Sequence, residues 1–448
     1  MMTKTPTNTQ RELFRPLLSD IIDMKHPLVV LADKIDWQKF EDEFAGKYCL
    51  NNGRPSAEVR LMVGLHYLKF AYNLSDEETV GNWVENPYWQ YFTGRKFFEH
   101  KFPIDPSNMS RWRKRIGTEG AEMILALTVE TGMKSKFIKP SELKTVNADT
   151  TVQEKNIRFP TDARLYDRVR ERLVKEAKRF GISLRQSFER CSRKALHRQS
   201  GYAKARQMKR AGKEVRKIRT YLGRVMRDIL RKVSSPSGKL AELLAIAGKL
   251  LEQKRDSKDK IYSVHEPQTE CICKGKAHKR YEFGNKVGVV TTSKTNWILG
   301  ATSYHGNPYD GHTLESAILQ VRRVCGVTPE TVVVDMGYRK HGCEALADVQ
   351  IVDRFRKNKR MRSVYAKWKR RSAVEPVIGH LKSEHRLGRN WLKGVFGDDI
   401  NVILAAAGKN IRKLLRFCAD IFVLLRIGEV FCKFIANFPY QRQTVCHW

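Results

Sequence analysis

The sequence predicts an α/β protein whose mixed sheet is interrupted by a long basic helical insertion and preceded by an all-helical segment. Three observations predict this fold: apolar residues at helical spacing up to about residue 125, strand-like runs on both sides of residues 160–262, and helical spacing between those runs. The chain has 448 residues, enough for about two to four domains. We expect domains at residues 1–125 and 140–420, the insertion at 160–262 and a helical tail at 421–448.

The N-terminal segment carries clear helix signals. A helix is expected over residues 56–70, and Ser75 with Glu78 three residues later forms a capping box that opens the next helix. Many aromatic side chains follow, and we expect most of them in a core, since large rings bury much apolar area. We therefore predict that residues 11–117 are helical and self-contained.

A short basic helix is expected over residues 106–117, with Pro106 near its start and Gly117 at its end. It would display four cations to solvent: Arg111, Arg113, Lys114 and Arg115. A basic helix that follows two others is typical of a helix-turn-helix, which places its last helix in the major groove of DNA. A solvated basic helix without a partner is the alternative.

Strand-like runs occur in two parts of the chain. Residues 145–152 are rich in β-branched side chains and are expected to form a strand. Residues 286–292 and 297–302 are expected as neighbouring strands, followed by a helix over residues 314–324. Residues 331–334 form a short apolar run typical of a strand covered on both faces. Helix–strand alternation continues to residue 352, and we expect helices from residue 365 onward.

Half of the net positive charge lies in the insertion. Residues 164–232 hold 24 Lys or Arg against six Asp or Glu, a net charge of +18. Their apolar residues suffice for a helical hairpin but not for a large core of its own. Charges of one sign repel one another and are usually balanced by a polyanion, so we expect nucleic-acid contact here.

The whole chain is strongly basic, with 84 Lys and Arg against 48 Asp and Glu and a net charge of +36. This balance disfavours an enzyme for small neutral substrates and favours a polyanionic partner, nucleic acid first. No run of about 18 uncharged apolar residues is present, so no membrane-spanning helix is expected. The N-terminus lacks the apolar core of a signal peptide, and the nine cysteines lack disulfide-framework spacing. Both features indicate a reducing, cytoplasmic location.

Two acidic residues stand at the ends of expected strands. Asp149 follows the apolar run that begins at residue 145, and Asp335 directly follows residues 331–334. A buried strand that ends in an aspartate is a rigid way to present a metal ligand. A turn residue or a helix cap is the alternative role for each of them.

A third acidic residue lies between two cations at helical spacing. Arg371, Glu375 and Lys382 would share one face of a helix. Pro376 suits the first turn of a helix, so the helix is expected to begin near Glu375 and to leave Arg371 just outside. An amphipathic helix with internal ion pairs is the alternative.

These motifs together resemble the bacterial insertion-sequence transposases of the DDE type, most closely the insertion sequence five group. The resemblance rests on Asp149 in NADTT, Asp335 in DMGY and the Arg-x3-Glu-x6-Lys run from Arg371. Other runs match the family in the same order along nearly the whole chain: TTVQEKNIRFPTDARL, YEFGNKVGVV, GNPYDGHTL and EPVIGHLKSEHRLGRNWLKG. One position departs from the family, because Trp368 stands where its motif has Tyr.

The resemblance implies an RNase H-like catalytic core with Asp149, Asp335 and Glu375 as catalytic triad and metal ligands. It implies two Mg²⁺ ions, or Mn²⁺ in their place, which can activate an attacking oxygen and stabilise a leaving one. Arg371 and Lys382 are expected to bind phosphate near the site. The implied partners are double-stranded DNA, at the terminal inverted repeats and the target, and further copies of the chain in a homodimer or higher oligomer.

Three hypotheses about function therefore stand. The first is an active transposase that binds the ends of its element, cleaves them and joins them to target DNA, on the bacterial nucleoid. The second is a catalytically inactive DNA-binding protein derived from such an element. The third is a tyrosine-type recombinase, which would form a covalent phosphotyrosyl adduct with DNA. The residues Ile421, Leu424, Leu425, Val430, Phe431 and Phe434 are expected either in a subunit interface or in the core.

Overall fold

One six-stranded mixed sheet forms the centre of the computed structural model, which describes residues 15–48, 55–254, 256–273, 279–352 and 369–436, with side chains to residue 420. The central strand β1 (Thr145–Glu154) is antiparallel to β3 (Tyr281–Thr292) and parallel to β5 (Thr331–Val334). The short strand β6 (Asp348–Ile351) lies parallel to β5. Both β2 (Glu270–Cys273) and β4 (Ile298–Tyr304) pair antiparallel with β3. The predicted α/β class is confirmed.

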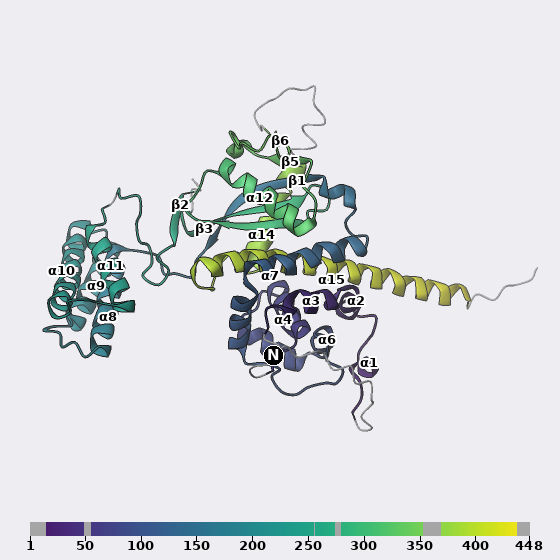
Figure 1. Cartoon of the computed structure of the whole chain (residues 1–448), viewed down its shortest axis with the longest axis horizontal. Helices are drawn as coiled ribbons and strands as arrows, with labels where there is room; N and C mark the ends of the chain where they lie inside the picture. Colours follow the sequence, from purple (N-terminus) through teal and green to yellow (C-terminus); the bar gives the residue numbers. More distant parts are fainter. Residues whose placement is uncertain (1–14, 49–54, 255, 274–278, 353–368, 437–448) are drawn as a thin grey trace, which may run out of the picture.

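Two long helices cover one face of the sheet. These are α7 (Pro106–Lys134) and α15 (Gly394–Ala436), which run between the sheet and the N-terminal helices (Figure 1). On the far side of α15 lie α1 (Leu18–Ile21), α2 (Pro27–Lys34), α3 (Trp37–Ala45), α4 (Val59–Ala71), α5 (Asp76–Glu85) and α6 (Pro87–Phe92). The 3-10 helix η1 (Pro140–Leu143) leads from α7 into β1.

The N-terminal helices share one core with the sheet. A single cluster of buried apolar residues runs from Leu28 through α4 and α15 to the sheet. Helix α4 is buried at 12 of its 13 positions, and α15 approaches it so closely that a Cβ on Gly408 would lie 2.5 Å from the Cβ of Phe70. The prediction of a self-contained N-terminal unit is therefore wrong, because α4 is buried on all its faces and needs cover from α15 as well as from the N-terminal helices.

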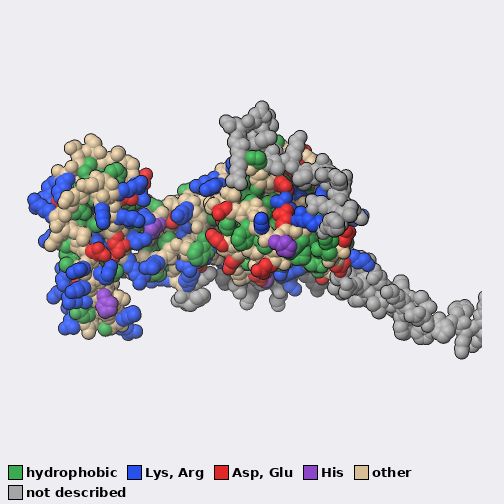
Figure 2. All heavy atoms as spheres, turned by 90° about the horizontal axis from the view of Figure 1, so that it is seen from below, with side chains coloured by type: hydrophobic (Ala, Val, Ile, Leu, Met, Phe, Trp, Pro, Cys, Tyr) green, Lys and Arg blue, Asp and Glu red, His purple; other side chains and the backbone are tan. Residues whose placement is uncertain are grey.

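The insertion follows β1 and precedes β2 along the chain, and it forms a four-helix unit to one side of the sheet (Figure 1). It consists of α8 (Asp162–Arg179), α9 (Glu189–Lys204), α10 (Met208–Lys232) and α11 (Gly238–Glu252). Apolar residues of these helices form a cluster of their own, and part of it comes from α11, beyond residues 164–232, for which the sequence predicts a hairpin without a large core of its own. Leu240, Leu243, Leu244 and Ala247, at helical spacing in α11, supply the missing apolar face. Lys and Arg side chains cover much of the surface of the unit (Figure 2).

The basic helix begins as predicted at the start of α7. Asp105 is its N-cap and accepts a hydrogen bond from the backbone of Ser107, and Gly117 interrupts the helix with φ of 71°. Arg111, Lys114 and Arg115 are exposed. The prediction that Arg113 is displayed is wrong: it is 3% exposed and both outer nitrogens of its guanidinium bind the Asp76 carboxylate.

The C-terminal part contains α14 (Val374–Glu384) and α15, which continues without a break across residue 421. The six apolar residues expected after that position, either in a subunit interface or in the core, lie outside the residues whose side chains are described. Helix α12 (Asp310–Cys325) connects β4 to β5, and the 3-10 helix η2 (Met336–Tyr338) follows β5. Among the described helices, none is long and apolar enough to cross a membrane.

Candidate active site

The register of the sheet brings Asp149 and Asp335 side by side. In the parallel pair of β1 and β5, Asn147 lies opposite Val333. The same offset two residues further on sets Asp149 beside Asp335, which directly follows β5. Asp149 itself lies within β1 and not at the end of a strand as predicted, because β1 continues to Glu154 in its pairing with β3. The Asp335 carboxylate caps η2 by accepting a hydrogen bond from the Gly337 backbone N–H at 2.9 Å.

Glu375 reaches the same place from α14. Residues 369–372 form a helical turn before α14, and Pro376 stands in the first turn of α14, as predicted. Arg371 lies just outside this helix. The Asn147 side chain of β1 donates a 3.1 Å hydrogen bond to the Arg370 carbonyl oxygen and ties this turn to the middle of the sheet.

Arg371 contacts all three acidic residues. Its Nη2 lies 2.9 Å from Asp149 Oδ2 and 3.2 Å from Asp335 Oδ2, and its Nη1 lies 3.6 Å from Glu375 Oε1. The Arg371 and Asp149 side chains are only 12% and 14% exposed, so the attraction between these two is weakly screened by water. The structure thus brings together four of the residues that the sequence selected from three distant positions.

The other selected cations lie elsewhere. By helical spacing, Lys382 stands on the same side of α14 as Glu375, two turns further along. Arg111, Lys114 and Arg115 belong to the first half of α7 among the N-terminal helices. Trp368, the position that departs from the family motif, lies outside the described residues.

The donor set suits a divalent cation. Asp149, Asp335 and Glu375 offer carboxylate oxygens, the ligands that Mg²⁺ prefers. In the described part of the chain, no three His, Cys, Asp or Glu side chains are grouped closely enough to hold a metal ion. A cation nevertheless stands between the two aspartates, namely the Arg371 guanidinium. Mg²⁺ needs oxygens at about 2.0–2.1 Å, so the carboxylates would have to close in as this guanidinium withdraws.

Asp310 is a fourth carboxylate at the site, which the sequence analysis missed. Its Oδ1 accepts hydrogen bonds from the Thr150 hydroxyl at 3.0 Å and from the Lys286 ammonium at 2.9 Å. A Cβ built on Gly337 would lie 3.0 Å from Asp335 Oδ1 and 3.3 Å from Asp310 Oδ2. Asp310 is the first residue of α12 and directly follows a run of turn residues, so local sequence offered no signal for it beyond its place in GNPYDGHTL.

Tyr338 is a buried neighbour of these carboxylates. It is 2% exposed. Burial, together with the charges of Asp149, Asp310 and Asp335, holds the pKa of the Tyr338 hydroxyl well above its usual value. The phenol is therefore neutral at physiological pH. Tyr338 therefore adds no negative charge to the acidic cluster.

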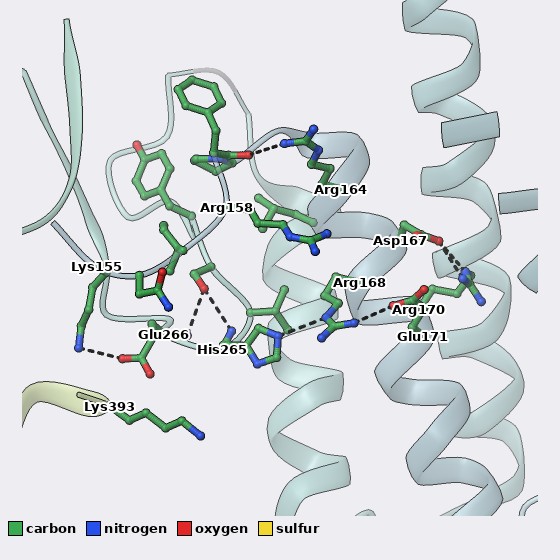
Figure 3. A pocket seen from close by; sticks show the side chains of 18 of the residues that line it. Lys155, Arg158, Arg164, Asp167, Arg168, Arg170, Glu171, His265, Glu266 and Lys393 are labelled. Carbon is green, nitrogen blue, oxygen red and sulfur yellow. Dashed lines mark hydrogen bonds and ion pairs between the residues drawn. The ribbon is translucent and has the colours of Figure 1, made fainter. Parts of the chain in front are cut away.

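A pocket of about 630 Å³ lies where the insertion meets the sheet. Figure 3 shows Arg158, Arg168 and Lys393 around it, from three separate segments of the chain. The ammonium group of buried Lys155 lies 2.7 Å from Asp398 and 3.1 Å from Glu266. These two ion pairs connect the end of the insertion, at Glu266, to the start of α15, at Asp398. The exposed cations of this junction make it a basic surface continuous with the insertion.

Comparison with known proteins gives two matches. Residues 16–115 match the family described as "Transposase domain (DUF772)". The chain is also 49% identical over 207 residues to "Uncharacterized protein ORF8 in nfe locus" of Rhizobium meliloti, an alignment that covers 46% of this chain and all of the relative. No solved structure matches the chain.

Proposed function

The chain belongs to the same family as the Rhizobium meliloti ORF8 protein and carries a transposase domain, and from this premise we propose that it is a DNA transposase of the DDE type. The observation that carries the proposal is the meeting of Asp149, Asp335 and Glu375 at Arg371. We propose that the sheet with α12, α14 and α15 is an RNase H-like catalytic core. The N-terminal helices would bind the terminal repeats, with Arg111, Lys114 and Arg115 as contacts.

The proposed reaction needs only groups that this site can provide. Asp149, Asp335 and Glu375 would hold Mg²⁺ ions, which would supply the Lewis acidity for phosphoryl transfer. Arg371, released from the carboxylates, can bind the scissile phosphate through its planar fork, and Lys382 can add a point charge. Hydrolysis at the end of the element frees a 3′-hydroxyl. That hydroxyl then attacks a target phosphate and displaces the target 3′-oxygen.

Joining two ends of one element requires both ends in one complex, so we propose at least a homodimer on DNA. The proposal also sets the protein on the bacterial nucleoid, in the cytoplasm. A strand-cleavage assay tests it. A duplex that carries the ends of the element is incubated with the protein and Mg²⁺ or Mn²⁺, and the products are separated under denaturing conditions.

Each hypothesis predicts a different product in this assay. A transposase yields nicks that end in a 3′-hydroxyl and depend on the metal. Specific binding without any nick would favour the inactive DNA-binding protein. An adduct of protein and DNA that survives denaturation would favour the tyrosine-type recombinase.

Replacing Asp310 by Asn is expected to lower the cleavage rate about 10–100-fold, the effect typical of a group that orients metal ligands. The change removes the charge that holds the Lys286 ammonium, which can then turn toward Asp149 and compete with a metal ion. Cleavage is measured as a function of Mg²⁺ concentration, and the variant should need more Mg²⁺. Glu315→Gln, on an exposed position of the same helix, is the matched control, and wild-type Mg²⁺ dependence in Asp310→Asn would contradict the assigned role.

The basic junction is expected to contribute non-specific phosphate contacts. Deleting residues 164–232 would destroy the core of the insertion, so the sharper test replaces the exposed Arg158, Arg164 and Lys393 by Gln. Each lost phosphate contact lowers the slope of log affinity against log salt by about 0.9. The slope is measured by fluorescence anisotropy on end DNA and on unrelated DNA, which should weaken alike.

The control for this experiment is Lys134→Gln, since Lys134 already pairs with Glu130 at 2.9 Å and Asp36 at 3.5 Å. It should leave the slope unchanged. An unchanged slope in the triple variant would refute the phosphate-contact role of the junction. A loss confined to end DNA would mean that the junction recognises sequence instead.

A further inference from the structure

A second pocket, of about 280 Å³, lies between α14 and α15. One face of each helix lines it. The α15 face carries four cations at helical spacing: Lys409, Arg412, Lys413 and Arg416. The α14 face carries Ala373, Pro376, Val377, His380 and Glu384. By the same helical spacing, Glu375 points to the opposite side of α14, so this helix separates the pocket from the acidic cluster.

Lys409 is the most deeply buried of these four cations. It is 7% exposed, and within the described part of the chain its ammonium group makes no hydrogen bond and no ion pair. Burial lowers the pKa of Lys409 to about 8. The charge of Glu384 opposes this lowering, and the charge of Arg416 adds to it. A buried ammonium without a partner is unfavourable. The ammonium group of Lys409 is therefore available to an anion that enters the pocket.

The neighbouring cations leave the pocket strongly positive. Lys413 donates hydrogen bonds to the carbonyl oxygens of Thr295 and Asn296, yet burial and the charge of Lys409 lower its pKa to about 8 as well. Arg412 stacks on Tyr72, which leaves its charge in place. Four cations thus face one carboxylate.

Glu384 is that carboxylate, the one acidic residue among the described residues that line the pocket. It does not neutralise Lys409, because its Oε1 lies 2.6 Å from His380 Nδ1 and its Oε2 lies 3.9 Å from Arg416 Nη2. The pocket consequently keeps an excess of positive charge. An anion of small size would relieve the repulsion between its walls.

We propose that this pocket binds a phosphate group of the DNA backbone, with Lys409 as its innermost contact. The ammonium groups act as point charges and the guanidinium groups offer forked hydrogen bonds to phosphate oxygens. The assignment to DNA rests on the proposed function; the affinity for phosphate does not. A phosphate here lies across α14 from the carboxylates, about one helix diameter away, on the order of 10–12 Å. It would therefore anchor the DNA beside the cleavage site and take no part in the chemistry.

Two variants with opposite expected effects on DNA affinity test the proposal in the full-length protein. Lys409→Met should weaken binding of duplex DNA about 5–10-fold at ~0.1 M salt and lower the salt slope by about one. Glu384→Gln should strengthen binding, because it removes the competing carboxylate from the same pocket. Lys409→Met should also unfold at the wild-type temperature or above it, since it removes an unpaired buried charge. A variant that had merely lost its structure would melt lower.

A second arm separates the sources of phosphate. Inorganic phosphate at millimolar concentration, against chloride at equal ionic strength, should raise the melting temperature of the wild type, and of Glu384→Gln by more, but not of Lys409→Met. This arm needs no DNA cleavage, so it stands apart from the test of the transposase activity. A phosphate response lost in Lys409→Met without any change in DNA affinity would overturn the assignment to DNA. Equal behaviour of both variants and the wild type in both arms would overturn the proposal entirely.

Discussion

Replacing Asp149 by Asn is expected to reduce metal-dependent strand cleavage about 10³-fold or more while the ends of the element are bound as before, a loss of the size seen when a preorganised catalytic group is removed. The reason is geometric. Asp149 stands at the middle of the cluster, on the central strand, and is the partner that Arg371 approaches most closely. Cleavage rates in Mg²⁺ and Mn²⁺, with anisotropy for end binding, measure both parts of the expectation.

The same variant should not lose stability. Three carboxylates around one guanidinium carry a net charge of −2 and repel one another, so neutralising one of them is expected to leave the melting temperature of the metal-free protein unchanged or higher. Asp335→Asn should behave likewise. Asp348→Asn, an exposed aspartate on β6, is the matched control and should cleave normally. Cleavage retained in Asp149→Asn would remove the catalytic assignment.

The elements that carry this site are predictable from local sequence. β5 is predicted to the residue because a continuous run of β-branched side chains is bounded by turn residues on both sides. Pro376 marks the start of α14 because proline is tolerated only in a first turn. The capping box at Ser75 is confirmed in α5 for the same kind of local reason.

What local sequence could not predict depends on contacts between distant positions. Arg113 has the spacing of an exposed cation, and only its distance from Asp76, 37 positions away, makes it a buried one. Asp310 joins the site because β3 delivers Lys286 and β1 delivers Thr150 to the same point. The meeting of Asp149, Asp335 and Glu375 is likewise a matter of topology, and its expectation came from the family resemblance rather than from spacing.

Replacing Asp76 by Ala is expected to destabilise the protein by about 3–5 kcal/mol, since removing one partner leaves a buried charge uncompensated. Arg113, which is 3% exposed, binds Asp76 with both outer nitrogens, at 2.9 and 2.6 Å. Lys69 adds a third contact at 2.6 Å. These residues join α4, α5 and α7, and through α4 they join the core shared with α15. Denaturant unfolding at pH 7 measures the loss.

The pH dependence of unfolding identifies the same network. Burial by itself would raise the pKa of Asp76, but Arg113 and Lys69 hold it well below its usual range. Stability from this carboxylate is therefore present above about pH 4, the pKa of the unfolded state, and is lost as the pH falls further. Burial lowers the pKa of neighbouring His66 to about 3. The unfolded chain takes up that proton below about pH 6.5 and the folded chain does not, so stability declines from there as well.

Two comparisons separate a buried network from an ordinary ion pair. Asp76→Ala combined with Arg113→Met should recover part of the lost stability, because the double change also removes the buried guanidinium and leaves only the Lys69 ammonium without its carboxylate. Glu330→Ala removes the partner of Lys144 from a pair that is 62% and 64% exposed, and it should cost at most about 1 kcal/mol. If Asp76→Ala lost no more than Glu330→Ala, or if the double variant were less stable than Asp76→Ala alone, the Arg113 charge would be solvated in the folded protein and free to bind DNA, as the sequence alone suggests.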